Sequence, residues 1–280
     1  PLLAMKRKSG VKSLESGVRR IVVKIGTSLF QEGFVFTPKY IASIVDDIVD
    51  IRKKGIEVII VSSGAIGCGM RAFGIAEYPK AIQERQALAS IGQPLLMDLY
   101  KSLFGKYNIV ISQILLTHNE LFGKKSSLNI LNTFSLLFKL GVIPIVNEND
   151  SVAIEELKEE LKIGDNDTLS SHLALLLNAS CLIILTDEEG VYKLNKDDFS
   201  HVIPVISEIT DEIRGFVKEK KGKNTIGGMK TKLKAAEMCI ESGIPAIIAS
   251  GKKERTLKKI LAGKREGTLF LPRIVLNLKS

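Results

Sequence analysis

Short runs of β-branched and apolar residues alternate with longer segments of helical period along this chain, and this alternation restricts the possible folds more than any other feature. The first run is RIVVKIG at 20–26, and the apolar residues of the next segment, 36–55, fall on one helical stripe. We expect Thr37 to cap this helix and Pro38 to be its first residue. Such alternation is typical of a parallel sheet with helices on both faces, so the sequence predicts an α/β fold.

The same pattern continues to about position 250. Further strands are predicted at 57–64, 109–117, 141–150, 181–187 and 245–250, and further helices at 79–104, at a segment ending near Leu140, at 165–179 and at 227–243. The Glu- and Lys-rich segment 151–163 fits either a solvated helix or a charged hairpin.

A chain of 280 residues, 45% of them hydrophobic, can bury a large core. No stretch rich in Pro, Gly or Ser divides it, so we expect one compact domain with two lobes at 19–270. Residues 1–18 are expected to form a flexible basic leader, and 271–280 a tail.

Charge and cysteine content narrow the choice of partners and compartment. Forty Lys and Arg against 31 Asp and Glu give a formal charge of +9, but much of the excess precedes the first strand, so a nucleic-acid partner is not expected. The three cysteines match no metal-binding spacing and are expected to be reduced, buried thiols. No apolar run is long enough to cross a membrane or to act as a signal peptide, so we expect a cytoplasmic protein without a membrane partner.

Polar or small residues follow four of the predicted strands, where ligands bind in open α/β sheets. These strand ends are Lys24 to Ser28, Ser62 to Gly69, Asn147 to Asp150, and Thr186 with Asp187. Each alone has an ordinary explanation, such as a lysine that reaches the surface or a polar turn. Together they indicate a ligand site, and a lysine before a glycine-bearing turn suits phosphate. Neither a P-loop nor a Rossmann glycine motif follows the first strand.

The stretch IGDNDTLS places Asp165, Asn166 and Asp167 directly before an apolar helical run. Because Asp and Asn cap helices and favour turns, a solvated turn is one interpretation. The polar strand ends elsewhere in the chain favour the other, in which these side chains face a ligand.

Several motifs occur in an order that resembles one known family. VVKIGTSLF, VSSGAIGCG, RQALASIGQ, PIVNENDSVA, GDNDTLS, LTDEEGVY and GGMKTKLKAA resemble the glutamate 5-kinases of the amino acid kinase family, and the resemblance runs from about Arg19 to Phe270. It implies a three-layer αβα sandwich with a mainly parallel central sheet. It also implies ATP-dependent phosphorylation of the side-chain carboxylate of L-glutamate to L-glutamyl 5-phosphate, the first step of proline biosynthesis.

The resemblance assigns roles to individual residues. Lys24 and Lys232 would be catalytic and flank the transferred phosphoryl group, and Asp165 and Asp167 would orient the lysines or the Mg²⁺ shell, with no direct protein ligand to the metal. Ser63, Asp150 and Asn166 would bind glutamate in the lobe at about 19–163 and at the start of the next. The lobe at about 164–270 would bind ATP. The nucleotide-binding residues would be Lys24, Gly26, Thr186, Asp187, Ile226, Gly227, Gly228, Met229, Lys230, Thr231 and Lys232.

The implied reaction needs no general base. A glutamate side chain has a reference pKa of about 4.3 and is already ionised at neutral pH. The difficulty is electrostatic, because an anionic acceptor must approach an anionic triphosphate. Lysines and Mg²⁺ would reduce this repulsion.

The family usually has G-T-G-G-M before its nucleotide lysine, whereas this chain has Thr225 and Ile226 in the first two positions. An alternative function is therefore a catalytically weak amino-acid sensor of the same fold. The resemblance further implies proline as feedback inhibitor, glutamate-5-semialdehyde dehydrogenase (γ-glutamyl phosphate reductase) as pathway partner, and a dimer or tetramer. We expect no C-terminal PUA domain, because the chain continues for only about ten residues after GTLF.

Overall fold

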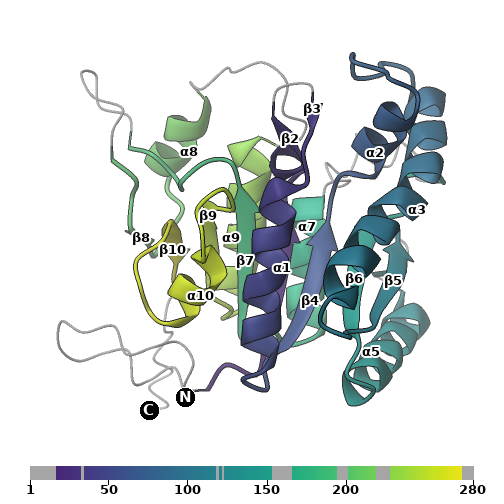
Figure 1. Ribbon diagram of the computed structural model, residues 1–280. Coiled ribbons are helices and arrows are strands. Elements are labelled where there is room, and N and C mark those ends of the chain that lie inside the picture. The colour runs from purple at the N-terminus through teal and green to yellow at the C-terminus, as the bar shows by residue number, and fades with distance from the viewer. Residues whose placement is uncertain are drawn as a thin grey trace, which may run out of the picture.

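The structure is a computed structural model, and it describes residues 17–32, 35–117, 120–121, 123–152, 166–193, 201–218 and 228–272. Its centre is an eight-stranded sheet in the order β5-β6-β4-β1-β7-β9-β10-β8 (Figure 1). The strands are β1 Arg20–Ile25, β4 Glu57–Ser62, β5 Ile111–Leu116, β6 Ile143–Glu148, β7 Cys181–Thr186, β8 Val205–Ile206, β9 Ala246–Ser250 and β10 Thr268–Phe270. A separate small hairpin pairs β2 Gln31–Glu32 with β3 Val35–Phe36.

The sheet is parallel from β5 to β9, and β10 pairs antiparallel to β9. The predicted mainly parallel sheet is therefore confirmed. β8 and β10 were not predicted, because strands of two and three residues are too short to show a period.

Helices cover both faces, which completes the predicted three layers. They are α1 Lys39–Arg52, α2 Ala65–Ala72, α3 Ile82–Gly105, α5 Lys124–Lys139, α7 Asn166–Leu176, α8 Asp211–Lys218, α9 Met229–Glu241 and α10 Thr256–Leu261, with a 3₁₀ turn η2 at Thr27–Leu29. Figure 1 shows α1 and α10 in front of the sheet and α7 and α9 behind it. α1 begins one residue later than predicted: Pro38 occupies the cap position, and no side chain caps the helix. The segment 151–163 lies outside the described residues after Val152.

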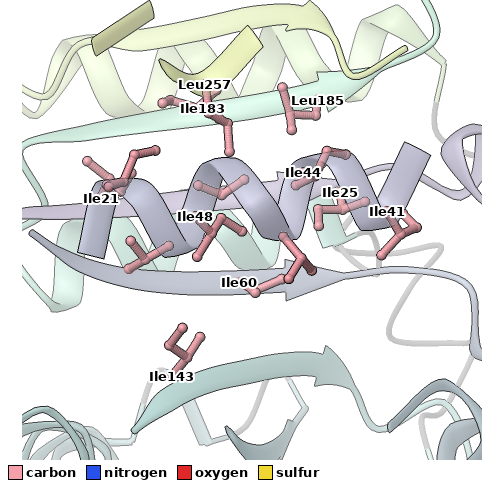
Figure 2. Packing of buried hydrophobic residues seen from close by; sticks show 14 of the residues in the cluster. Ile21, Ile25, Ile41, Ile44, Ile48, Ile60, Ile143, Ile183, Leu185 and Leu257 are labelled. Carbon is pink, nitrogen blue, oxygen red and sulfur yellow. The ribbon is translucent and has the colours of Figure 1, made fainter. Parts of the chain in front are cut away.

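Two apolar cores lie on opposite faces of the sheet. Ile21, Val23 and Ile25 of β1 belong to the core formed with α1, α3 and α10, and Figure 2 shows isoleucines of α1 packed over β1, β4 and β7. Val22 belongs to the other core, formed with α5, α7 and α9. Side chains alternate along a strand, so Lys24 is directed to the face of Val22, where α7 and α9 lie.

The predicted burial of the cysteines is confirmed. Cys68, Cys181 and Cys239 are buried free thiols. Burial raises the pKa of Cys68 to about 11 and the pKa values of Cys181 and Cys239 to about 12. In the described part of the chain, no helix combines the length and the apolar character that crossing a bilayer requires.

α2 and α3 cross with their backbones in direct contact. A Cβ atom on Gly92 would lie 1.8 Å from the carbonyl oxygen of Ala65 and 2.4 Å from the nitrogen of Gly69, and one on Gly69 would lie 2.1 Å from the carbonyl oxygen of Leu88. Only glycine allows this approach. Because α2 starts directly after β4, the contact holds the middle of α3 near the carboxyl end of that strand.

We expect Gly92→Ala to lower the free energy of unfolding by about 3 kcal/mol, since the added methyl group meets backbone atoms that cannot move aside. The matched control is Gly105→Ala in the same helix, where nothing lies within 4 Å of the added Cβ. This control should cause no loss of stability, because alanine favours helix. Urea unfolding measures both, and equal stability of the two variants would contradict the close contact.

Candidate active site

The carboxyl ends of β1, β4, β6 and β7 lie side by side, because these strands are parallel neighbours. Backbone hydrogen bonds continue beyond the strands: the nitrogen of Gly26 donates to Leu185 at 3.0 Å, and that of Ser63 donates to Ile25 at 3.1 Å. The four polar strand ends singled out in the sequence are thereby brought to one edge of the sheet.

A buried carboxylate joins two lysines at this edge. Asp167 is fully buried, and its Oδ1 lies 2.7 Å from Nζ of Lys24, while its Oδ2 lies 3.3 Å from Nζ of Lys232. Thr231 also donates to Oδ2, at 2.7 Å. The lysines are only 3% and 7% exposed. Burial acts to raise the pKa of Asp167, but the two ammonium groups and the hydrogen bonds outweigh it, and the pKa is lowered.

The three charged residues of this group come from three different elements. Lys24 lies on β1 and is directed by the strand alternation, Asp167 lies in the first turn of α7, and Lys232 lies in the first turn of α9. α9 starts directly after Gly228, whose carbonyl oxygen accepts from the backbone and the hydroxyl of Thr231. The three residues are far apart in the sequence, and even Asp167 and Lys232 are separated by 65 positions.

Amide side chains form a second group beside the first. Nδ2 of Asn166 donates to Oγ of Ser63 at 3.1 Å and to Oδ1 of Asn147 at 3.0 Å. Oδ1 of Asn147 also accepts from the backbone of Glu148 at 2.9 Å, and its Nδ2 donates to Oε1 of Gln93 at 2.8 Å. This group, Ser63, Gln93, Asn147 and Asn166, is called the amide cluster below.

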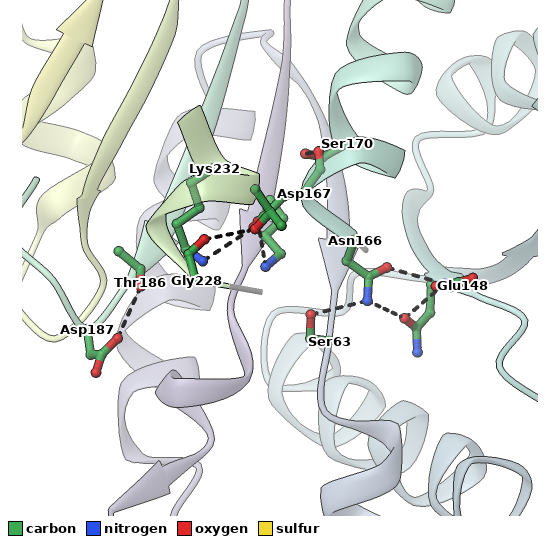
Figure 3. A network of polar contacts seen from close by, with 12 residues as sticks. Ser63, Glu148, Asn166, Asp167, Ser170, Thr186, Asp187, Gly228 and Lys232 are labelled. Carbon is green, nitrogen blue, oxygen red and sulfur yellow. Dashed lines mark hydrogen bonds and ion pairs between the residues drawn. The ribbon is translucent and has the colours of Figure 1, made fainter. Parts of the chain in front are cut away.

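The start of α7 connects the two groups. Figure 3 shows the side chain of Asn166 directed toward Ser63 and Glu148, and that of the adjacent Asp167 directed toward Lys232. The neutral side chain of Asn166 therefore contacts the amide cluster, and the negative side chain of the next residue, Asp167, contacts the two lysines.

Thr186 is the last residue of β7, and Asp187 follows it. β7 pairs with β1 on the side opposite β4. Oγ1 of Thr186 donates to Oδ1 of Asp187 at 3.1 Å. Burial acts to raise the pKa of Asp187, but hydrogen bonds from Ser28, from its own backbone and from Thr186 prevail, and the pKa is lowered. This strand end thus presents an ionised carboxylate at neutral pH.

The structure brings several of the predicted residues into contact in two groups. Lys24, Asp167, Thr231 and Lys232 meet in one group, and Ser63 and Asn166 meet in the amide cluster. Gly26 follows β1, two positions after Lys24, Asp150 follows β6, and Gly228, Met229 and Lys230 lie at the start of α9. Asp165, Ile226 and Gly227 lie outside the described residues.

Sequence reasoning placed Asn147 in a polar strand end without a role of its own, and it did not single out Gln93, although both lie in quoted motifs. Gln93 occurs on the buried stripe of α3 between Ala89 and Leu96. A polar residue on an apolar stripe is the signal that could have identified it.

Within the described ranges, no group of three or more His, Cys, Asp or Glu could hold a metal ion.

The sheet order, the three layers and the paired lysines define an α/β protein with two buried cations at the carboxyl edge of its sheet, where ligands bind in such folds. The chain belongs to the amino acid kinase family, whose pattern matches residues 19–250.

Curated relatives agree with this assignment over most of the chain. It is 42% identical to the glutamate 5-kinase of Clostridium acetobutylicum over 261 residues, which cover 92% of this chain and 96% of the relative. It is 40% identical to the glutamate 5-kinase of Lactococcus lactis over 259 residues, or 90% of this chain and 95% of the relative.

Solved structures share the fold at low sequence identity. A carbamate kinase from Giardia lamblia bound to AMP-PNP has a TM-score of 0.62 and 18% identity, covering 91% of this chain and 99% of that one. A UMP kinase from Bacillus anthracis has a TM-score of 0.59 and 16% identity, covering 91% and 97%.

The lysine pair makes folding stability depend on Asp167. Because the pKa of Asp167 is lowered in the folded protein, its charge stabilises the fold above the unfolded value of about 3.9, and this stabilisation is lost as the pH falls through the folded pKa. We expect Asp167→Asn to lower the free energy of unfolding by about 3 kcal/mol at neutral pH, since two buried cations lose their counter-charge.

Urea unfolding over a pH series checks this expectation. The difference between Asp167→Asn and the unsubstituted protein should begin to shrink as the pH falls below about 4, where the carboxyl group of the unfolded chain takes up a proton, and should be smallest below the lowered pKa of the native carboxylate. Asp98→Asn, at an exposed position of α3, is the control and should change little at any pH. A difference for Asp167→Asn that does not depend on pH would contradict the charge argument.

Proposed function

We propose that this protein transfers the γ-phosphoryl group of ATP to the side-chain carboxylate of L-glutamate, giving L-glutamyl 5-phosphate and ADP, the first step of proline biosynthesis. The observation that carries the proposal is the pair of buried lysines held at the sheet edge by Asp167. The curated relatives named glutamate 5-kinase, at 40–43% identity over nine-tenths of the chain, support the choice of acceptor.

The chemistry is a displacement at phosphorus. A carboxylate oxygen of glutamate forms a bond to the γ-phosphorus, the bond from that phosphorus to the bridging oxygen of ATP breaks, and its electron pair leaves with ADP. No proton is transferred, because the acceptor is already ionised. What remains for the protein is to align two anions and to neutralise the charge on the transferring oxygens.

Lys24 and Lys232 are suited to that task. In water two ammonium groups repel each other, but a shared carboxylate holds them together at a buried site. Backbone N–H groups at the turn after β1 add donors for phosphate oxygens. Positive groups fixed before the nucleotide arrives need little reorganisation during transfer.

The amide cluster and the segment after β6 would hold the amino-acid part of glutamate. Ser63 and Asn166 offer hydroxyl and amide groups, and the carboxylate of Asp150 suits an α-ammonium group. Thr186, Asp187 and the start of α9 would hold the nucleotide, together with Ile226 and Gly227. When bound, Mg²⁺ would neutralise part of the phosphate charge, and the nucleotide would supply most of its ligands.

The expected product is an acyl phosphate, which hydrolyses readily, so a reductase that consumes it is the expected pathway partner. Inhibition by proline, assembly into dimers or tetramers and a cytoplasmic location belong to the same proposal. A weak amino-acid sensor has no specific support among the described residues, because glutamate binding alone would not require two buried lysines beside Asp167.

The purified protein, supplied with ATP, Mg²⁺, L-glutamate and hydroxylamine, should form γ-glutamyl hydroxamate. Lys24→Met and Lys232→Met should each lower kcat by about 100-fold or more. Each substitution removes one of the two positive charges that would stabilise the negative charge on the transferred phosphoryl group. Lys139→Met, at an exposed position of α5, should keep full activity and serves as the control.

Hydroxamate formation at the original rate by both buried-lysine variants would overturn the roles given to Lys24 and Lys232. Calorimetry separates the sensor from the kinase: glutamate binding by the unsubstituted protein without any binding of an ATP analogue would favour the sensor. Binding of both ligands together with acceptor-dependent release of ADP would favour the kinase.

A further inference from the structure

The amide cluster contains one buried hydrogen-bond donor that is not used. The Gln93 side chain is only 7% exposed, and its Nε2 has no hydrogen-bond partner among the residues that the structure describes. Buried amide groups are nearly always hydrogen-bonded, because leaving one unpaired is unfavourable. An unpaired donor beside a candidate active site therefore points to a ligand.

The hydrogen-bond network fixes which atom of Gln93 is unpaired. A backbone N–H can only donate, so the side-chain atom of Asn147 that meets the N–H of Glu148 at 2.9 Å must be the oxygen. The other amide atom of Asn147 is then its nitrogen, which needs an acceptor and finds Oε1 of Gln93 at 2.8 Å. Nε2 is what remains, and it is a donor.

Rigid packing holds this donor in place. Gln93 follows Gly92, whose close contact with Ala65 and Gly69 locks α3 against the start of α2. Three residues further on, Leu96 is fully buried in the core. The side chain of Gln93 consequently has little freedom to turn toward solvent.

We propose that Gln93 is a further substrate-binding residue, whose Nε2 donates a hydrogen bond to the α-carboxylate of the acceptor amino acid. The inference rests on the proposed function for the identity of the acceptor. A donor cannot bind an α-ammonium group, so the choice falls on a carboxylate. Gln93 is linked through Asn147 to Asn166, whereas Lys24 and Lys232 contact Asp167, so Gln93 belongs to a different group from the lysines, which selects the α-carboxylate over the one that receives phosphate.

Gln93→Glu is the sharpest test, because it removes the proposed contact with the α-carboxylate and keeps the hydrogen bond with Asn147. The introduced side chain keeps an oxygen that can accept from Asn147, yet it replaces the unpaired donor by an anion. At about pH 8, kcat/KM for L-glutamate should fall by about 100-fold, while KM for ATP stays unchanged. A purely structural role through Asn147 would leave kcat/KM nearly intact, and that result would overturn the proposal.

A change of acceptor provides the second arm. In the α-amide of L-glutamic acid, an NH₂ group that can donate replaces one α-carboxylate oxygen. Gln93→Glu should shift the ratio of kcat/KM for the α-amide to that for L-glutamate by about tenfold or more in favour of the amide. Equal losses for the two acceptors would show that Gln93 does not contact the α-carboxylate and would overturn the inference.

Two controls keep the outcome interpretable. Gln83→Glu places the same new charge at an exposed position of α3 and should leave both kinetic constants unchanged. If Gln93→Glu does not fold, Gln93→Met replaces it, because it removes the donor without adding charge. The same shift in acceptor preference, though smaller, is then expected, and its absence counts against the proposal.

Calorimetry distinguishes failure of this inference from failure of the proposed function. If the unsubstituted protein binds L-glutamate but transfers no phosphate, the proposed reaction is wrong. Loss of glutamate binding in Gln93→Glu would still support the contact with Gln93. If the unsubstituted protein binds no L-glutamate in the presence of an ATP analogue, both fail.

Discussion

The salt bridge of Asp167 with Lys24 and Lys232 is the interaction on which the rest of the site depends. Three charges out of water are unfavourable individually, and they become tolerable only because β1, α7 and α9 bring them within about hydrogen-bond distance of one another. The assembled site therefore exists only in the folded protein. The shared anion keeps two cations together at the sheet edge, and in the proposed reaction they would already be oriented when the phosphate arrives.

Much of this arrangement follows from the order of elements in the sequence. Parallel strands leave their carboxyl ends on one edge, so the four polar strand ends could be assigned to one place before the fold was known. The alternation along β1 also decides which face Lys24 takes. What could not be predicted from local pattern is the three-way contact, because it depends on how α7 and α9 pack against each other across two segments distant in sequence.

Gln93 shows a different limit of sequence reasoning. Helical period correctly indicated a helix at 79–104, where α3 lies, and a polar residue on its apolar stripe was visible in the sequence. Its hydrogen-bonding state was not visible, since that depends on the orientation of Asn147, which the backbone of Glu148 sets. The strands β8 and β10 were missed for a simpler reason. They pair through contacts between residues distant in the sequence, and two or three residues are too few to show the alternation of a strand.

Asn166 and Asp167 are joined by a single peptide bond, yet one belongs to the amide cluster and the other to the lysine pair. The spacing between the two backbone positions that carry these groups is therefore set by covalent geometry and the first turn of α7. If an acceptor amino acid is held at both ends, this spacing limits the length of the acceptor that can contact both groups. An acceptor with one methylene group fewer would satisfy one group of contacts and fall short of the other, so selectivity for chain length would arise without any residue that repels the shorter molecule.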